Sequence, residues 1–207
     1  MMKKYVAIKR IIDIVISIIA LVSFLPASLI IIILIKMESK GPVLFKQQRI
    51  GKHKNRFMIL KLRTMKRDAP CDVPTHLLLH EIHMHTTRIG ALLRKTSLDE
   101  WPQFINILKG EMSLVGPRPA LWNQYDLILE RERCGVNDIV PGLTGWAQIN
   151  GRDTLSVEAK VGFDGEYFAS RSTLLDIKII ILTIMKVINR EGVGEGVGED
   201  RGKGEIL

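Results

Sequence analysis

The feature that most constrains this fold is an apolar run near the N-terminus, "IIDIVISIIALVSFLPASLIIIILI" (11–35). It holds 25 residues with one charge, Asp13. About 20 apolar residues suffice to cross the hydrocarbon core of a bilayer. A secretory signal would have a shorter apolar run and a small-residue cleavage site, whereas this run continues directly into Lys36 and Glu38. We therefore expect a retained membrane segment over 1–36, followed by one domain over 37–190.

Both flanks of the apolar run are basic. Four Lys and Arg residues precede it, and eleven lie from Lys36 to Arg67 against one acid, Glu38. The positive-inside rule would keep both flanks cytoplasmic, which a hairpin satisfies and a straight span does not. Pro26 would kink or break a helix, and Ser23 is placed to bond a backbone group freed by that proline. The residues alone leave a re-entrant helix and a single-pass helix equally open.

Composition indicates the kind of partner and compartment. The net charge is +8, which favours an anionic partner such as nucleic acid, a phosphorylated substrate or anionic lipid. Cys71 and Cys134 show no metal or redox spacing, so we expect two buried thiols in a reducing compartment.

Periodicity predicts an α+β fold that is mostly helical. Alternating apolar residues around "GKHKN" predict a small β-hairpin in 41–65, whose cations form a solvated face or meet anionic headgroups or a phosphorylated ligand. Amphipathic patterns predict helices over 75–95, 100–109, 121–133, 156–168 and 172–190. The last has Asp176, Thr183 and Lys186 on its polar stripe, which is typical of a helix lying in the membrane interface or of a buried one.

The remaining segments are predicted to be irregular. Two prolines make "SLVGPRPAL" (113–121) a stiff, extended loop that holds Arg118. The segment "VPGLTGWAQINGR" (140–152) is expected to be a Gly-rich loop, and the Gly/Glu-rich tail over 191–207 to be disordered.

Four histidines cluster in the segment 75–87. His76 and His80 are one helical turn apart, a usable metal-ligand spacing. His83 and His85 point apart on a helix, so the set lacks a second pair on the same face. An exposed, tolerant segment is favoured over a metal site.

Two adjacent acids, Asp99 and Glu100, stand before Pro102. If Asp99 is the N-cap, Pro102 falls at the third helical position, where backbone donors are orphaned anyway. The helix N-terminus would then stabilise both carboxylates and also attract a phosphate. Simple capping, including a capping box from Ser97 to Glu100, is the alternative.

The surroundings of the two acids favour phosphate chemistry. A carboxylate can attack phosphorus and form an acyl phosphate. Two adjacent anions need a divalent cation, and Mg²⁺ prefers carboxylate and phosphate oxygens. Nearby arginines are suited to bidentate phosphate contacts.

At these residues the chain resembles the monotopic phosphoglycosyl transferases, also called bacterial sugar transferases. The resemblance runs from about Lys9 to Arg190. The blocks that carry it are "KRIIDIVIS", "GPVLFKQQRIGKHKNRFMILKLRTM", "LLRKTSLDEWPQFINILKGEMSLVGPRP", "PGLTGWAQINGR" and "LLDIKI".

The resemblance implies an activity and a location. Family members move a sugar-1-phosphate from a UDP-sugar to a polyprenol phosphate, such as undecaprenyl phosphate. They release UMP, require Mg²⁺, and carry out the first membrane step of bacterial glycan assembly. It also implies a helix that is re-entrant at a proline, contact with membrane phospholipids, and a position on the cytoplasmic face of the bacterial inner membrane.

The resemblance also implies roles for single residues. Asp99 is implied as the nucleophile that holds the phosphosugar covalently, and Glu100 as its companion in binding Mg²⁺. Contacts to phosphate, nucleotide or other parts of the substrate are implied for Lys61, Arg94, Pro117, Arg118, Arg152 and Asp176.

Some features depart from the family pattern. Leu25 stands where Ser often precedes the helix-breaking proline, with Ser23 three positions before Pro26. The stretch 75–87 and the tail match no family motif. The chain has no extra N-terminal membrane helices, so a minimal catalytic domain is expected.

Three other functions make different demands on the chain. A membrane-anchored nucleic-acid-binding protein is disfavoured because the chain has few aromatic residues, shows no such motif, and leaves the acids at 99–100 without a role. A non-catalytic scaffold would not need Asp99. An Mg²⁺-dependent hydrolase of nucleotide sugars would release UMP without a lipid acceptor.

Overall fold

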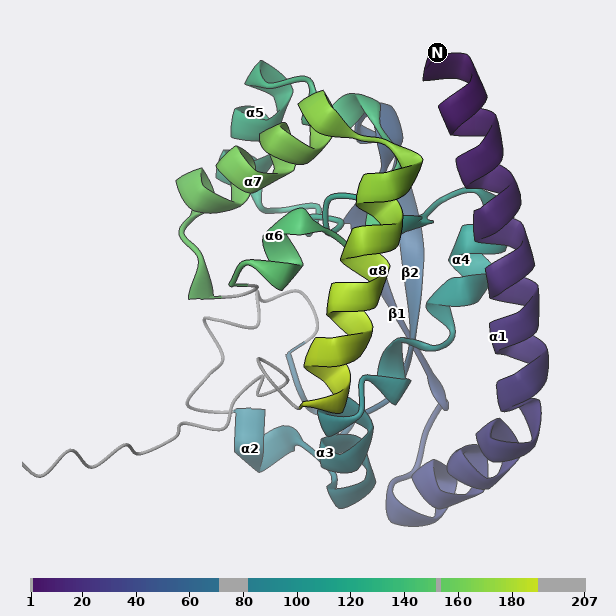
Figure 1. The fold of residues 1–207 in the computed structure, drawn as a ribbon. Helices are drawn as coiled ribbons and strands as arrows, with labels where there is room; N and C mark the ends of the chain where they lie inside the picture. The colour runs from purple at the N-terminus through teal and green to yellow at the C-terminus, as the bar shows by residue number, and fades with distance from the viewer. Residues whose placement is uncertain (1, 71–81, 152–153, 190–207) are drawn as a thin grey trace, which may run out of the picture.

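The computed structural model describes residues 2–70, 82–151 and 154–189 of the chain (Figure 1). The expected mostly helical α+β class is confirmed. The elements in chain order are α1 (Met2–Glu38), β1 (Leu44–Ile50), η1 (Lys52–Lys54), β2 (Arg56–Leu62), α2 (Ile82–His85), α3 (Arg88–Lys95), η3 (Leu98–Glu100), α4 (Gln103–Lys109), β3 (Ser113–Val115), α5 (Tyr125–Arg133), η4 (Val136–Asp138), β4 (Gly142–Thr144), α6 (Trp146–Ile149), α7 (Val157–Ser170) and α8 (Thr173–Ile188).

The apolar N-terminal run forms one long helix, α1, with Pro26 inside it. Among the described residues it is the one helix long and apolar enough to cross a membrane. It runs along one side of the molecule and bends toward its C-terminal end (Figure 1). Beside the proline, the Ser28 hydroxyl donates to the carbonyl oxygen of Leu25 at 2.7 Å, whereas Ser23 is exposed.

The two faces of α1 are reversed relative to a helix of a water-soluble protein. The residues that it buries include Asp13, Ser17 and Ser28. From residue 11 to residue 33 its exposed side chains are mostly large and apolar, among them Ile11, Val15, Ile18, Ile19, Val22, Leu25, Leu29, Ile30 and Ile33. Water would disfavour such a surface, whereas hydrocarbon would not.

Polar side chains attach α1 to the rest of the chain. Arg10 donates to the carbonyl oxygens of Ile107 and Leu108, at 2.6 and 2.8 Å, in the last turn of α4. The Asp13 carboxylate accepts from the amide of Leu114 at 3.0 Å. The guanidinium satisfies terminal helix carbonyls, so these contacts both cap α4 and fix it against α1.

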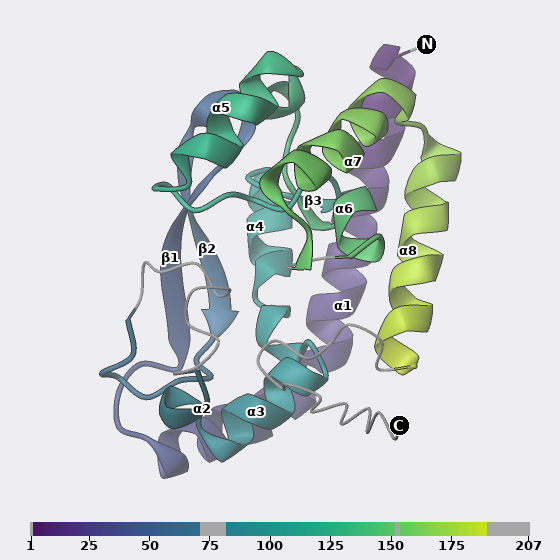
Figure 2. The ribbon, with the colours of Figure 1, turned by 90° about the vertical axis from the view of Figure 1, so that its left-hand side faces the viewer.

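The predicted hairpin is confirmed. Strands β1 and β2 pair in antiparallel register from Leu44 opposite Leu62 to Ile50 opposite Arg56. In Figure 2, α4 lies between this hairpin and α1. Asn106 of α4 donates to the carbonyl oxygen of Met58 and accepts from the amide of Leu60, at 2.8 and 3.0 Å. A single buried amide therefore joins α4 to the free edge of β2.

The segment 140–152 is not the loop predicted from its glycines. It contains β4, which pairs in parallel with β3, and the short helix α6. Gly142 allows the pairing because a Cβ there would lie 2.1 Å from the amide nitrogen of Gly116. Glycine was interpreted as a loop former, whereas here it permits two backbones to approach closely.

The predicted helices are present with shifted boundaries. The helix expected over 75–95 is represented in the described part by α2 and α3, which are separated at Thr87, the N-cap of α3. The helix expected from 121 begins at Tyr125. Ser156 and Ser172 cap α7 and α8, and their side chains accept from the amides three residues ahead.

The main core lies where β2, α4, β3, α6, α7 and α8 meet. Its buried members are Phe57, Ile59, Ile107, Met112, Leu114, Val115, Ile149, Tyr167 and Ile179. The ends of these elements, on one side of the core, carry the polar residues described next.

Candidate active site

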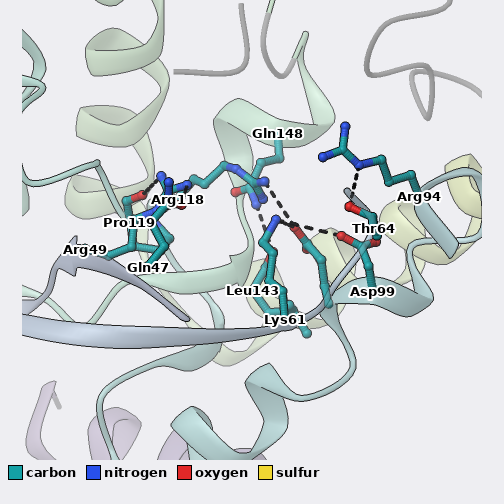
Figure 3. Close-up of polar contacts among 11 residues, drawn as sticks. Gln47, Arg49, Lys61, Thr64, Arg94, Asp99, Arg118, Pro119, Leu143 and Gln148 are labelled. Atoms are coloured by element: carbon teal, nitrogen blue, oxygen red, sulfur yellow. Dashed lines mark hydrogen bonds and ion pairs between the residues drawn. The ribbon is translucent and has the colours of Figure 1, made fainter. Parts of the chain in front are cut away.

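Strand β2 carries a lysine whose side chain lies beside two carboxylates. Lys61 shares the strand face of Phe57 and Ile59, which are buried, so its side chain is directed inward. The Lys61 amine lies 2.9 Å from a Glu100 oxygen and 4.0 Å from an Asp99 oxygen (Figure 3). The Lys61 side chain is 16% exposed. The structure thus brings together three of the predicted site residues.

Asp99 and Glu100 lie in a tight 3-10 turn, η3, instead of at a helix N-cap. Helix α4 begins later, at Gln103, with Pro102 as its N-cap. Ser97 adopts a left-handed conformation, with φ of 56°, and makes no side-chain cap bond, so the capping box is also wrong. The physical reason is Pro102, which cannot donate to the turn before it and so delays the helix.

The left-handed turn at Ser97 sets the direction of both acids. Asp99 is 7% exposed, and Glu100 faces Lys61 from the adjoining position. A solvated cap would leave its carboxylate in water. These carboxylates instead point inward and lie among cations. Such an arrangement is typical of carboxylates that take part in catalysis.

Arg118 approaches Glu100 from the other side. Its Nη2 donates to Glu100 Oε1 at 3.1 Å, so this oxygen is shared by Lys61 and Arg118. The guanidinium comes from the loop after β3, and the first three residues of the predicted loop 113–121 form that strand. Pro117, before it, is buried, and its carbonyl oxygen accepts from the amide of Gly142 at 2.9 Å. Pro117 therefore shapes the loop through its backbone.

Arg94 completes the predicted cluster. Its Nε donates to the Thr64 hydroxyl at 2.9 Å, and its Nη1 is buried with no hydrogen-bond partner among the described residues. Helix α3 brings Arg94 there because Gly90 packs against the carbonyl of Thr64, where a Cβ would lie 2.0 Å from the oxygen. The carboxylate of Glu38, at the end of α1, accepts from the amides of Arg88 and Ile89 and holds the start of α3.

Arg94 therefore carries an unused donor. A buried guanidinium nitrogen without a partner is costly, and an anionic oxygen of a ligand would satisfy it.

Asp176 lies elsewhere. Its carboxylate accepts from Lys9, Tyr5 and Tyr167, at 2.9, 3.0 and 2.8 Å. Burial, aided by the Asp176 charge, raises the pKa of the Tyr167 phenol above its ordinary value, so this phenol stays a neutral donor. These contacts join α1, α7 and α8 (Figure 2). The described structure thus gives Asp176 three protein partners, none of which is another predicted site residue.

Other predicted residues cannot be placed. Arg152 lies outside the described residues, as do His76, His80 and the tail over 191–207.

Gln148 was missed by the sequence reasoning. Its Nε2 donates to the carbonyl oxygen of Leu143 at 2.9 Å, and its side chain lies beside Arg118 in Figure 3. Its segment was predicted to be a loop, which hid the short helix that presents it. Thr64, the partner of Arg94, was also missed, because a lone threonine at a strand end carries no signal.

The donor set fits a magnesium ion that is shared with a substrate. In the described ranges no three His, Cys, Asp or Glu residues gather closely enough to form an all-protein site. Mg²⁺ is often held by one or two carboxylates together with substrate phosphates and water. Asp99 and Glu100 supply two adjacent carboxylates, and Lys61 and Arg118 partly balance their charge.

A profile of the family described as "Bacterial sugar transferase" matches residues 4–190. The chain belongs to this family. It is 40% identical over 186 residues to an uncharacterized sugar transferase, EpsL, of Bacillus subtilis, covering 90% of each chain. It is 41% identical over 187 residues to the UDP-glucose:undecaprenyl-phosphate glucose-1-phosphate transferase of Escherichia coli, covering 86% of this chain and 40% of that protein.

A third relative carries a different sugar in its name. The UDP-N-acetylgalactosamine-undecaprenyl-phosphate N-acetylgalactosaminephosphotransferase of Aeromonas hydrophila is 37% identical over 195 residues, covering 91% of this chain and 45% of that protein. This member of the family therefore spans less than half the length of the two relatives whose names state a substrate. The match with all three confirms the family resemblance that the sequence blocks predicted.

Proposed function

We propose that this chain transfers a sugar-1-phosphate from a UDP-sugar to undecaprenyl phosphate. The observation that carries the proposal is the pairing of Asp99 and Glu100 with Lys61 and Arg118, with the unpaired donor of Arg94 nearby. Two relatives whose names state this reaction, with glucose and with N-acetylgalactosamine, support the class of donor and acceptor.

In the proposed reaction Asp99 is the nucleophile. Its carboxylate oxygen forms a bond to the phosphorus next to the sugar, and the bond from that phosphorus to the bridging oxygen breaks. UMP leaves with the bridging oxygen, and an aspartyl phosphosugar remains. An oxygen of undecaprenyl phosphate then attacks the same phosphorus and releases the Asp99 carboxylate, giving the lipid diphosphate sugar. Neither step needs a proton donor.

The cations would lower the electrostatic barrier to this reaction. A carboxylate must approach a charged diphosphate, and Lys61 and Arg118 reduce that repulsion from fixed positions. Arg94 Nη1, which has no hydrogen-bond partner within the described part of the chain, would donate to a phosphate oxygen. Asp99 and Glu100 are the residues that would hold Mg²⁺, which when bound neutralises charge on phosphate oxygens.

The outer surfaces support a site at the membrane. Besides α1, helix α8 exposes large apolar residues on its outer face: Leu174, Ile177, Ile181, Ile184, Met185 and Ile188. Two polar residues of α8 face the protein: Thr183 bonds Thr144 at 2.7 Å, and Lys186 donates to the carbonyl oxygen of Ile149. We infer that both apolar faces meet lipid, with α8 in the interface.

We infer further that α1 is re-entrant. Lys9, near its start, bonds Asp176, and Glu38, at its end, bonds the first amides of α3. One polar domain thus contacts both ends of the helix. A straight span would place those contacts on opposite sides of the bilayer, so we place both ends on the cytoplasmic face.

The test is UMP release from a panel of UDP-sugars by the full chain in nanodiscs with Mg²⁺. We expect release that depends on undecaprenyl phosphate and singles out one sugar. Equal turnover without the lipid would replace the transferase by a nucleotide-sugar hydrolase. If folded protein releases no UMP from any UDP-sugar of the panel, the proposed donor class is overturned.

A further inference from the structure

The loop that carries Arg118 is held at four consecutive carbonyl groups. The carbonyl oxygen of Pro117 accepts from Gly142 in β4, and that of Ala120 accepts from Ile50 in β1, both at 2.9 Å. Between them, side chains hold the other two. Arg131 Nη1 donates to the carbonyl oxygen of Arg118 at 2.8 Å, and Arg49 Nη1 donates to that of Pro119 at 3.1 Å. Three elements therefore fix one short loop.

Arg131 is placed for this contact and not for a ligand. It is 6% exposed, on the inner face of α5. Its Nε and Nη2 donate to one oxygen of Asp164 on α7, at 3.0 and 2.6 Å. All three guanidinium nitrogens are thus used inside the protein, and Asp164 is 1% exposed. A phosphate could not reach this arginine without breaking the pair.

A buried ion pair is weak evidence for stability. Desolvation of both charges offsets their attraction, and a well-packed apolar pair of similar volume is often as stable or more so. The pair of Arg131 and Asp164 gives something that an apolar pair does not, namely a donor in a fixed direction. That donor meets the carbonyl of Arg118, the residue whose side chain bonds Glu100.

We propose that Arg131, oriented by Asp164, is a positioning residue for Arg118 in the transfer reaction. This inference rests on the proposed function. The carbonyl of Arg118 belongs to the peptide unit joining it to Pro119, so fixing that unit fixes the backbone from which the guanidinium extends. Arg131 acts through the loop, and Arg49, which also bonds Gln47, supports the next peptide unit.

The test compares variants that keep the fold. Removing Arg131 alone would leave Asp164 buried and unpaired, so the main variant is the double substitution Arg131→Met and Asp164→Leu. Arg131→Lys is the second, because it keeps the charge beside Asp164 but lacks the rigid planar guanidinium that aims one nitrogen at the carbonyl while two others bond Asp164. Arg133→Met is the matched control, since Arg133 lies on the same helix, is exposed and pairs locally with Glu130.

The kinetic readout is a double-mutant cycle with Arg118→Met. In the wild-type background we expect the double substitution to lower kcat/KM on the order of 10- to 100-fold, as misplacement of a reacting group does. In the Arg118→Met background the same double substitution should lower kcat/KM by less than about twofold, because both changes remove the same contribution. Equal losses in the two backgrounds would overturn the proposal and leave a merely structural role.

The second readout does not depend on turnover. Hydrogen–deuterium exchange of the peptide 113–121 should quicken in both Arg131 variants and stay unchanged in Arg133→Met. Unchanged exchange in this peptide would overturn the positioning role even if activity fell. If wild-type protein transfers no sugar phosphate, the proposed function fails, and exchange still decides whether Arg131 orders the loop.

Discussion

The indole of Trp101 donates a hydrogen bond to the carbonyl oxygen of Ala20, at 3.2 Å, across 81 positions of sequence. Its ring also packs on Phe24, with ring centroids 5.2 Å apart. Trp101 stands two residues after Asp99, and Ala20 and Phe24 lie in the middle of α1. The proposed nucleophile is therefore attached, by a short piece of chain, to the centre of the apolar helix.

Substituting Trp101→Phe tests this attachment. The ring contact should remain while the hydrogen bond is lost, which typically costs about 1 kcal/mol of unfolding free energy. For a chain of this size the melting temperature should fall by about 2–4 °C. Thermal unfolding in detergent measures it, with Trp122→Phe as control. Equal shifts in both variants would mean that the bond to Ala20 contributes nothing specific.

Asp99→Asn should abolish transfer, by more than about 10³-fold, because an amide cannot replace the attacking carboxylate. The variant should fold and partition with membranes as the wild type does. Asp138→Asn is the control, since Asp138 is an exposed aspartate that pairs with the exposed His53. The assay is UMP release from the preferred UDP-sugar. Substantial remaining turnover would remove Asp99 as the nucleophile.

Glu100→Gln should raise the Mg²⁺ concentration needed for half-maximal activity, because a neutral amide is a weaker ligand than a carboxylate. It also removes the charge that attracts Lys61 and Arg118. A magnesium titration of UMP release measures the shift, and Glu130→Gln, on the surface of α5, is the control. An unchanged titration curve would contradict the metal role of Glu100.

Asp176→Asn separates a structural role from a substrate contact. An asparagine cannot accept from Lys9, Tyr5 and Tyr167 as the carboxylate does, so we expect a loss of about 3 kcal/mol in unfolding free energy. The KM for the UDP-sugar should stay within about twofold. Thermal unfolding and steady-state kinetics measure the two effects, with exposed Asp126→Asn as control. A raised KM with unchanged stability would place Asp176 in the substrate site.

Cysteine labelling tests the topology of α1. In a background with Cys71→Ser and Cys134→Ser, Lys3→Cys and Lys40→Cys should both react only with a reagent that reaches the cytoplasmic side. Both side chains are exposed, so accessibility within the protein does not limit the reaction. Labelling of the two positions from opposite sides would establish a true span and exclude the re-entrant arrangement.

Local chemistry made much of this fold predictable. Alternation in 41–65 predicted the hairpin, and amphipathic periodicity predicted helices starting at 156 and 172, one residue before α7 and α8 begin. The same kind of reasoning failed at Asp99, where a proline and the left-handed Ser97 made a turn that resembles a cap in sequence.

Pairings distant in sequence were not predictable. Strands β3 and β4 are three residues each and pair only in the folded chain, so no periodicity in the sequence predicts them. The inner position of Arg131 was equally hidden, because a charged residue on an amphipathic helix reads as solvated until its partner on α7 is known. Predicting the pair of Lys61 and Glu100 would require both the register of β2 and the turn at Ser97.

The polar attachments of α1 have a consequence for biogenesis. This helix leaves the ribosome before its partners do: the amide that Asp13 bonds belongs to a residue made 101 positions later, and Asp176 follows Lys9 by 167 positions. Until those partners exist, the charged side chains of α1 depend on water. We infer that deep insertion of α1 waits for synthesis of nearly the whole chain, so that the protein enters its membrane at the end of folding.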